Sequence, residues 1–115
     1  MISVIIVNYN GKKWLEKCLN SIFDQTYRDY EVIFVDNNSI DGSIDFVNNR
    51  YGNKSNLKVV KSDKNLGFAG GNNLGIKYAS GEYILLLNND TYVEENFLEK
   101  LVDFYNNNSF NLVGC

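Results

Sequence analysis

Residues 83–91 read YILLLNNDT, a run of mostly aliphatic side chains that stops on two asparagines and an aspartate. A short, continuous apolar run of this kind is typical of a β-strand that is covered on both faces. Such strands belong to parallel sheets with helices packed on both sides. The stretch therefore predicts a buried parallel strand that places polar side chains at one end of a sheet.

Segments of similar character recur along the chain and alternate with helical patterns. The predicted strands are 3–7, 31–36, 57–62 and 82–87. The predicted helices are marked by Leu15, Cys18, Leu19 and Ile22, by the segment 43–50, by Leu74, Tyr78 and Ala79 as far as Gly81, and by Phe97, Leu98, Leu101, Val102 and Tyr105. The alternation predicts βαβ units, and hence a Rossmann-like three-layer α/β/α fold with a mostly parallel sheet.

Length and composition indicate one domain. A chain of 115 residues, with 44% hydrophobic and 14% aromatic residues, is long enough for roughly one core. We therefore interpret residues 1–115 as a single domain. The last stretch, FNLVGC (110–115), begins another apolar run and then stops, which suggests that the domain is incomplete at this point.

Charge and hydropathy argue against several classes of partner. The net charge is −3 and the lysines are scattered, so we expect no nucleic-acid partner. The longest apolar runs are far shorter than the ~20 residues needed to cross a bilayer, and Met1 leads directly into a strand. We therefore expect a cytoplasmic protein without a signal peptide.

Three residue types that often mark function give little support for it here. Histidine is absent, so any acid–base chemistry must use carboxylates, lysine or tyrosine. Cys18 and Cys115 are far apart and form no CxxC pair, and we interpret both as buried free thiols. We interpret Trp14 as a packing residue rather than a platform for a sugar ring.

Polar residues follow the predicted strands at one end of the sheet, where open α/β sheets bind their ligands. They are Asn8, Tyr9 and Asn10 after the first strand, Asp36, Asn37 and Asn38 after the second, and Asn88, Asn89 and Asp90 after the fourth. Asp90 could hold Mg²⁺ or Mn²⁺ if phosphate oxygens and waters completed an octahedral shell. Tyr9 offers a flat face to a base, so the pattern predicts a site for a nucleoside diphosphate that carries another group.

A glycine-rich segment completes this predicted site. Gly67, Gly70 and Gly71 are expected to form a tight loop before the third helix, and backbone amides near that helix start would favour a diphosphate. The same glycines could instead serve only close packing of a helix on the sheet.

Structural interpretations remain open for other residues of the site as well. Asp36 could cap the following turn or helix. Tyr9 could be a half-buried sheet residue, and Asn88 and Asn89 could be turn residues in an asparagine-rich chain.

Motifs of three other nucleotide-binding classes are missing. A dinucleotide-dependent dehydrogenase would carry G-x-G-x-x-G after the first strand, where NYNGKKW (8–14) has one glycine. The Walker motif GxxxxGK[ST] is absent. The glycine-rich, basic loop expected of sugar-phosphate nucleotidyltransferases is not found after the first strand either.

The chain resembles the nucleotide-binding half of family 2 inverting glycosyltransferases, which have the type A glycosyltransferase fold. The resemblance rests on SVIIVNYNG (3–11), CLNSIFDQTYRDYEVIFVDNNSIDGS (18–43), NLGFAGGNNLGI (65–76) and ASGEYILLLNNDT (79–91). It implies transfer of a sugar from a UDP-, dTDP- or GDP-sugar to an acceptor hydroxyl with inversion, in polysaccharide or glycan synthesis. NLGFAGGNN and NND look most like bacterial rhamnosyltransferase-type enzymes, so the sugar would be a hexosyl or rhamnosyl group.

The resemblance also implies roles for individual residues. Tyr9 would flank the base, Asp36 and Asn37 would lie at the base and ribose, and Asp90 would be the ligand of Mg²⁺ or Mn²⁺. The triplet 88–90 would take the place of the family's DXD motif. The implied nucleotide-sugar-binding residues are Asn8, Tyr9, Asn10, Asp36, Asn37, Asn38, Gly67, Asn72, Asn73, Asn88, Asn89 and Asp90.

The sequence departs from the family pattern at three points. Asn37 stands where many members have a second aspartate, and Asn88 or Asn89 stands where many have an acidic residue earlier in the DXD triplet. The catalytic base comes from the second half of the family's domain, so we assign none here. The alternative is therefore a nucleotide-sugar-binding module, or an inactive fragment, without transfer activity.

The expected partners follow from the same resemblance. The acceptor would be a saccharide or a lipid-linked acceptor, which would place the protein at the inner face of the membrane as a peripheral protein. A sheet edge left open could pair with a second copy, so we expect a homo-oligomer.

Overall fold

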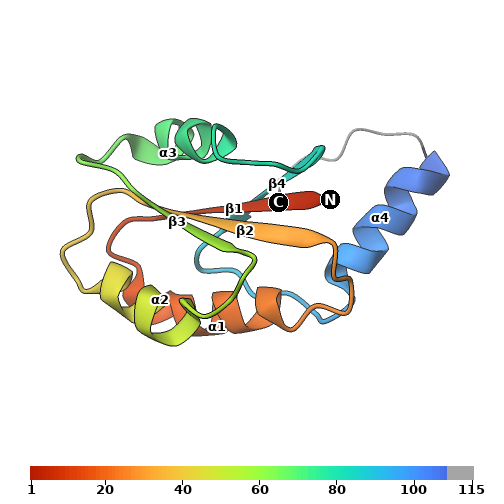
Figure 1. Cartoon of the computed structure of the whole chain (residues 1–115), viewed down its shortest axis with the longest axis horizontal. Coiled ribbons are helices and arrows are strands. Elements are labelled where there is room, and N and C mark those ends of the chain that lie inside the picture. The colour runs from red at the N-terminus through yellow and green to blue at the C-terminus, as the bar shows by residue number, and fades with distance from the viewer. Residues whose placement is uncertain (109–115) are drawn as a thin grey trace.

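The computed structural model describes residues 1–108 and consists of four strands that alternate with four helices. Figure 1 shows the elements in chain order: β1 (Ile2–Asn8), α1 (Lys12–Phe23), β2 (Tyr30–Asp36), α2 (Ser43–Tyr51), β3 (Leu57–Lys61), α3 (Gly67–Ile76), β4 (Tyr83–Asn88) and α4 (Phe97–Asn108). Every predicted strand is present, as are the first, second and fourth predicted helices, whereas the third helix begins and ends earlier than predicted. The predicted final apolar run, 110–115, and Cys115 lie outside the described residues.

The strands form one parallel sheet in the order β3-β2-β1-β4, which places β1 and β2 in the centre. Helix α3 covers one face, and helices α1 and α2 cover the other (Figure 1). The predicted three-layer α/β/α fold with a parallel sheet is therefore confirmed. Because all strands run the same way, their carboxyl ends share one edge of the sheet.

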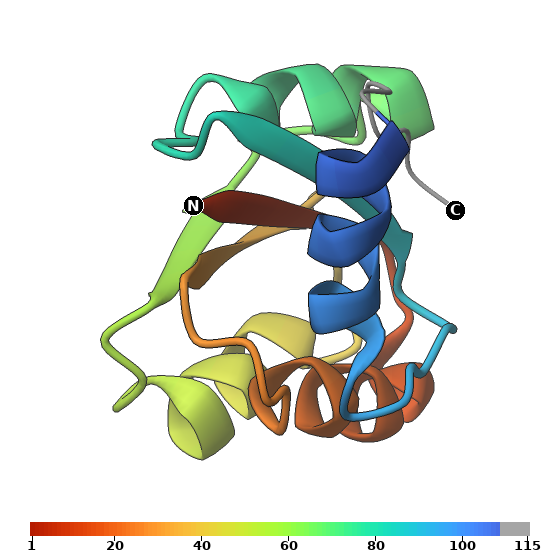
Figure 2. The same cartoon turned by 90° about the vertical axis from the view of Figure 1, so that its right-hand side faces the viewer.

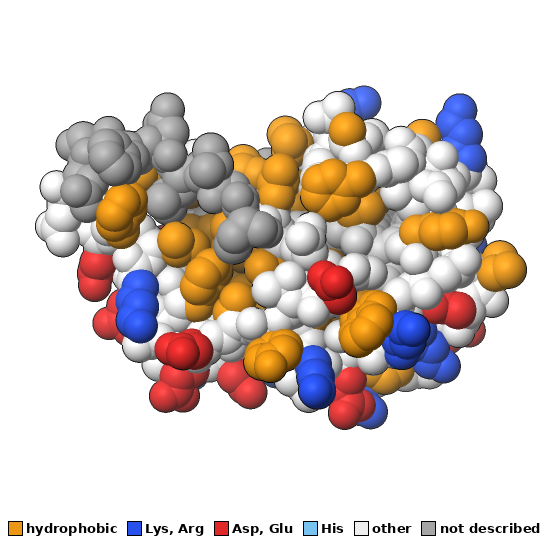
Figure 3. All heavy atoms as spheres, turned by 180° about the vertical axis from the view of Figure 1, so that it is seen from behind, with side chains coloured by type: hydrophobic (Ala, Val, Ile, Leu, Met, Phe, Trp, Pro, Cys, Tyr) orange, Lys and Arg blue, Asp and Glu red, His pale blue; other side chains and the backbone are white. Residues whose placement is uncertain are grey.

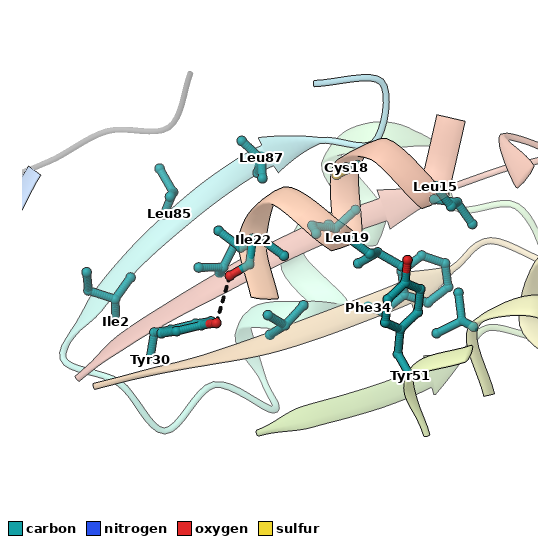
Figure 4. Packing of buried hydrophobic residues seen from close by; sticks show 14 of the residues in the cluster. Ile2, Leu15, Cys18, Leu19, Ile22, Tyr30, Phe34, Tyr51, Leu85 and Leu87 are labelled. Carbon is teal, nitrogen blue, oxygen red and sulfur yellow. Dashed lines mark hydrogen bonds between the residues drawn. The ribbon is translucent and has the colours of Figure 1, made fainter. Parts of the chain in front are cut away.

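The core lies on both faces of the sheet because successive side chains of a strand point to opposite sides. The larger cluster packs the sheet against α1 and α2, and its members include Leu15, Cys18, Leu19 and Ile22 from α1 and Val4, Ile6 and Phe34 from the strands (Figure 4). In the same view the Tyr30 hydroxyl donates to the carbonyl oxygen of Ile22 at 2.7 Å. The smaller cluster, around Ile5, Ile33 and Val35, packs against α3.

Helix α3 differs from the prediction, because the glycine segment is helical rather than a loop. It begins at Gly67 and ends at Ile76, so Tyr78 and Ala79 lie in the turn beyond it. Glycine disfavours helices, but here it allows close packing. A Cβ on Gly71 would lie 2.6 Å from Val7 Cγ1, and one on Gly75 would lie 2.7 Å from Ile5 Cγ2.

Helix α4 lies at the opposite end of the molecule from the carboxyl ends of the strands (Figures 1 and 2). It is held there by Leu98, which is fully buried, and by an edge-on contact between the Tyr83 and Tyr105 rings at 4.7 Å between centroids. The carboxyl edge of the sheet is therefore not covered by α4.

Charged and hydrophobic side chains are intermixed on the face that Figure 3 shows. Seen from behind, acidic side chains gather in the lower half of the view, on the side of α1, and hydrophobic side chains form several patches (Figure 3). Among residues 1–108, no helix is both long enough and apolar enough to span a bilayer.

Candidate functional site

The carboxyl ends of β1, β2 and β4 bring three predicted site residues into one hydrogen-bonded group. Asn8 and Asp36 are the last residues of neighbouring strands and face each other in register. Asn8 is fully buried; its Nδ2 donates to Asp36 Oδ1 at 3.0 Å, and its Oδ1 accepts from Asn89 Nδ2 at 2.9 Å. Asn8 therefore links the ends of three strands.

Asp36 uses its carboxylate within the chain. It is fully buried, and besides Asn8 it binds Ser39 twice: the Ser39 backbone amide donates to Oδ2 at 2.8 Å and the Ser39 hydroxyl donates to Oδ1 at 2.7 Å. This is the geometry of an Asp-stabilised turn, so the capping interpretation of Asp36 holds. Contact between Asp36 and a base or ribose stays a prediction.

Asn37 ties the end of β2 to the start of helix α3. Its Nδ2 donates to the carbonyl oxygen of Gly67 at 3.0 Å, and its Oδ1 lies 3.4 Å from the Leu66 amide nitrogen. Gly67 has a φ of 76°, and a Cβ there would meet no atom within 4 Å. The backbone at Gly67 is therefore open on the side where a ligand could approach, unlike that of Gly71.

The loop after β1 is fastened to the loop after β2. Asn10 adopts a φ of 52° and Asn38 a φ of 66°, values that asparagine tolerates better than most residues. The Asn10 amide donates to Ser39 Oγ at 2.8 Å, and Asn10 Oδ1 accepts from the Ile40 amide at 2.8 Å. Tyr9 lies between Asn8 and Asn10, directly after the end of β1, and its side chain is 51% exposed.

Helix α3 places its two predicted residues differently. Asn72 is buried, with 6% exposure, and its side chain makes no hydrogen bond with another residue of 1–108. Asn73 is exposed. Neither belongs to the hydrogen-bonded group around Asn8.

Asp90 is exposed in the turn that follows β4, where the Thr91 amide donates to the Asn88 carbonyl oxygen at 3.1 Å. The Cys18 thiol lies beneath this turn, with Sγ 3.7 Å from the same carbonyl oxygen. Burial, and secondarily the negative charge of Asp90, raises the pKa of Cys18 to about 12. The thiol is therefore protonated and inert at neutral pH, as predicted for a buried free cysteine.

A family model described as "Glycosyl transferase family 2" matches residues 3–115, which is nearly the whole chain. The chain belongs to glycosyl transferase family 2. Its predicted family and its predicted type A fold are thereby confirmed.

Individual family 2 relatives agree with this. The poly(ribitol-phosphate) beta-glucosyltransferase of Bacillus spizizenii is 38% identical over 108 residues, which are 91% of this chain and 17% of the relative. Residues 1–349 of Staphylococcus aureus TarS, in complex with UDP-GlcNAc, superpose with a TM-score of 0.87 at 32% identity, over 94% of this chain and 32% of that 1–349 chain.

A second solved structure is an archaeal mannosyltransferase. PcManGT from Pyrobaculum calidifontis, in complex with GDP-Man and Mn²⁺, superposes with a TM-score of 0.85 at 26% identity, over 90% of this chain and 32% of that one. The chain spans less than half the length of the curated relatives that it matches.

One carboxylate, that of Asp90, stands where the resemblance places the metal ligand of a family 2 enzyme. No three His, Cys, Asp or Glu side chains gather into a metal-binding group in the described part of the chain. The Asp90 carboxylate has no hydrogen bond or ion pair with another residue of 1–108, and it is exposed. It therefore fits a divalent cation that takes its remaining oxygen ligands from a diphosphate and water.

Sequence reasoning missed three residues that shape this family 2 site. Ser39 joins both strand-end loops. Asp41 accepts from the Lys12 amide at 3.0 Å and so fixes the start of α1. Gly11 is buried next to the Asn8–Asn89 hydrogen bond. Ser39 and Asp41 follow Asp36 in the turn-rich segment NNSIDGS, which was a signal for a structured turn but not for its contacts with another loop.

Trp14 also differs from its prediction. It is 47% exposed, and Lys13 Nζ lies 4.9 Å above the centre of its ring. Trp14 lines an open surface groove of about 690 Å³ with Asn10, Lys12, Lys17, Phe46 and others. The interpretation of Trp14 as a packing residue is therefore wrong.

Proposed function

We propose that this chain is the donor-binding part of an inverting glycosyltransferase that transfers a sugar from a nucleotide-diphosphate sugar to an acceptor hydroxyl. The observation that carries the proposal is the superposition on TarS bound to UDP-GlcNAc, with a TM-score of 0.87 over 94% of this chain. Family 2 membership makes sugar transfer the reaction of the parent protein. The structure with GDP-Man supports a donor of the same chemical class.

The open features at the carboxyl edge suit the parts of such a donor. The exposed Tyr9 ring offers a face on which a base can stack. The open side of Gly67, at the start of α3, suits a diphosphate because the amides of a helix's first turn and the helix dipole favour anions, although the Gly67 amide itself donates to Asn65 Oδ1 at 2.9 Å. Asp90 lies after the edge strand β4, which is hydrogen-bonded to the central strand that ends at Asn8.

Asp90 would be the protein ligand of Mg²⁺ or Mn²⁺ in this proposal. The cation would stabilise the negative charge that develops on the departing nucleoside diphosphate. The role of Asp90 is to hold one position of its octahedral shell while the diphosphate supplies others. The Mn²⁺ that accompanies GDP-Man in PcManGT supports this assignment.

The donor sugar and the acceptor complete the proposal. A UDP-sugar is favoured over a GDP- or dTDP-sugar because the TarS complex contains UDP-GlcNAc, and a hexosyl donor fits both complexes better than a rhamnosyl donor. The poly(ribitol-phosphate) beta-glucosyltransferase supports a role in cell-surface polysaccharide synthesis, with a saccharide or lipid-linked acceptor.

Titration calorimetry with UDP, GDP and dTDP, each with and without Mn²⁺, tests the proposal. We expect at least one nucleotide to bind, and Mn²⁺ to strengthen its binding in the original chain but not in Asp90→Asn. Asp103→Asn is the matched control because Asp103 is an exposed carboxylate on α4, at the far end of the molecule. Absence of binding by all three nucleotides would contradict donor binding.

The second candidate is a binding module without transfer activity. It is supported by the site residues, none of which we assign as a catalytic base: the Asp36 carboxylate accepts from Ser39 and Asn8, and Asp90 is proposed to bind the cation. Nucleotide binding without release of sugar from UDP-GlcNAc to water or to any added acceptor would support the module.

A further inference from the structure

We propose that Asn89 is a positioning residue: through Asn8 it holds the segment that carries Tyr9, and so it couples the diphosphate end of the donor site to the base end. The donor site itself rests on the function proposed above. The family resemblance places the triplet 88–90 at a metal, but it does not assign Asn89 a role in positioning Tyr9. The inference comes from the hydrogen bonds around Asn8.

The polarity of these hydrogen bonds is fixed by Asp36. Both of its carboxylate oxygens accept from Ser39, and Oδ1 also accepts from Asn8, so Asn8 turns its amide group toward Asp36. The same Nδ2 lies 3.3 Å from Ser39 Oγ. Asn8 Oδ1 is then left facing Asn89, and it can only accept. Residue 89 must therefore be a donor, which an asparagine is and an aspartate at neutral pH is not.

The same requirement argues against an acidic residue at the middle position of the triplet. A carboxylate at position 89 would put two acceptors against each other at the 2.9 Å separation now seen between Asn89 Nδ2 and Asn8 Oδ1. Asn8 could not rotate to compensate without losing its bond to Asp36. The amide at 89 is therefore matched to Asn8 rather than to a cation.

Gly11 shows that the backbone is shaped around this pair. A Cβ on Gly11 would lie 2.3 Å from Asn89 Nδ2 and 2.7 Å from Asn8 Oδ1. Real Cβ atoms do not approach other atoms this closely, so any larger residue would force the two amides apart. Gly11 is itself only two residues from Tyr9.

The hydrogen bonds continue from Asn8 to both sides of Tyr9. Asn8 precedes Tyr9 and Asn10 follows it, and Ser39 Oγ contacts both, at 3.3 Å from Asn8 Nδ2 and 2.8 Å from the Asn10 amide nitrogen. Tyr9 is thus presented by a segment fastened at each end. Loss of the bond from Asn89 would loosen the first of these two attachments.

A comparison of Asn89→Asp with Asn88→Asp tests the inference. Both changes add one negative charge to the same turn, but the Asn88 side chain is exposed and makes no hydrogen bond with a described residue. The probe is UMP in the presence of EDTA, because a nucleoside monophosphate without metal reports on the base end of the site. GMP and dTMP replace UMP if GDP or dTDP binds best.

We expect Asn89→Asp to weaken UMP binding roughly tenfold more than Asn88→Asp does, which corresponds to about 1.4 kcal/mol. Gly11→Ala should also weaken UMP binding, although this substitution leaves Asn89 unchanged. If Asn89 served only the metal, Asn89→Asp would instead strengthen Mn²⁺-dependent UDP binding and leave UMP binding equal to that of Asn88→Asp. That result would overturn the inference but not the proposed function.

Hydrogen exchange gives a second readout that needs no nucleotide. The amides of Asn10 and Ile40 make the bonds that fasten the Tyr9 segment, so we expect both to exchange at least several-fold faster in Asn89→Asp than in Asn88→Asp. Thermal unfolding of the two variants checks that the fold persists, and Asn89→Ala replaces Asn89→Asp if the latter does not fold. Equal exchange in the variants at 88 and 89 would overturn the inference, even if no nucleotide bound to the original chain.

Discussion

The two ends of the central strands each bury a carboxylate against a partner on the neighbouring strand, but they satisfy it differently. At the amino end, Glu31 faces Ser3, accepts from its hydroxyl at 2.6 Å and from the Ser80 amide at 2.6 Å, and pairs with Lys58 Nζ at 3.0 Å. At the carboxyl end, Asp36 faces Asn8 and has only neutral donors.

The difference separates a structural cluster from a site. The hydrogen bonds of the Glu31 group all go to residues of the protein. Lys58 also donates to the Tyr78 carbonyl oxygen at 2.9 Å, so the group fixes the connection between α3 and β4. The Asp36 group instead orients loops whose outer residues, such as Tyr9 and Asp90, stay exposed. The same pair of strands thus uses one carboxylate for stability and the other to shape a binding edge.

Removal of Glu31 should have the largest effect on stability. We expect Glu31→Ala to lower the free energy of unfolding by about 3 kcal/mol, because it leaves buried donors without an acceptor and Lys58 without its ion pair. Urea unfolding measures the change, with the exposed Glu95→Ala as control. Nucleotide affinity should be unchanged, and a loss of affinity at 25 °C in the folded variant would contradict the division between the two ends.

Asp36→Asn should affect both stability and binding. An amide in place of one carboxylate oxygen puts a donor against a donor of Asn8 or Ser39, and we expect a loss of about 2 kcal/mol in unfolding free energy. We also expect roughly tenfold weaker nucleotide binding, or about 1.4 kcal/mol. If calorimetry showed full affinity in this variant, the buried carboxylate would not be shaping the site.

The Glu31 cluster should also give the protein a specific sensitivity to acid. Burial raises the pKa of Glu31, but the hydrogen bonds from Ser3 and the Ser80 amide and the pairing with Lys58 outweigh burial and leave it lowered overall. The stability that this lowering contributes is present above the unfolded-state pKa of about 4.3 and is lost as pH falls through the folded-state value. The stability difference between the original chain and Glu31→Gln should therefore shrink between pH 7 and pH 3, as measured by urea unfolding at each pH. A constant difference would count against an ionised Glu31.

The smallest expected effect is that of Asp90→Asn on the reactivity of Cys18, which lies beneath the turn that carries Asp90. Its pKa of about 12 predicts alkylation by iodoacetamide at pH 8.5 roughly a thousandfold slower than that of a free thiol. Asp90→Asn should speed the reaction only slightly, because burial is the larger cause of the raised pKa. Mass mapping of the peptides distinguishes Cys18 from Cys115, and rapid labelling of Cys18 would contradict its burial.

The strands and most helices could be predicted because their apolar periods reflect burial directly. The prediction for helix α3 was wrong in part because the helix propensity of glycine is low. Gly71 and Gly75 are nevertheless helical, because their lack of a side chain lets α3 pack against Val7 and Ile5, about seventy residues away. The strand ends could also be located, since polar residues after apolar runs mark them.

The contacts within the site could not be predicted in the same way. The position of Asp36 at this edge could be predicted, but its hydrogen bonds with Ser39 and Asn8 could not, and the role of Ser39 depends on a loop 29 residues earlier in the chain. A sequence pattern shows which residues reach an edge of a sheet, but the direction in which each amide or carboxylate turns depends on all of its neighbours together.

The hydrogen bond between Asn8 and Asn89 also limits how this chain can diverge. A substitution at either position alone would leave a buried polar atom without a hydrogen-bond partner. Substitutions at 8 and 89 should therefore arise together in descendants. A non-glycine residue at 11 should appear only after the amide pair has been replaced. Mutational routes toward an acidic triplet would therefore begin at the end of the first strand and not at the triplet itself.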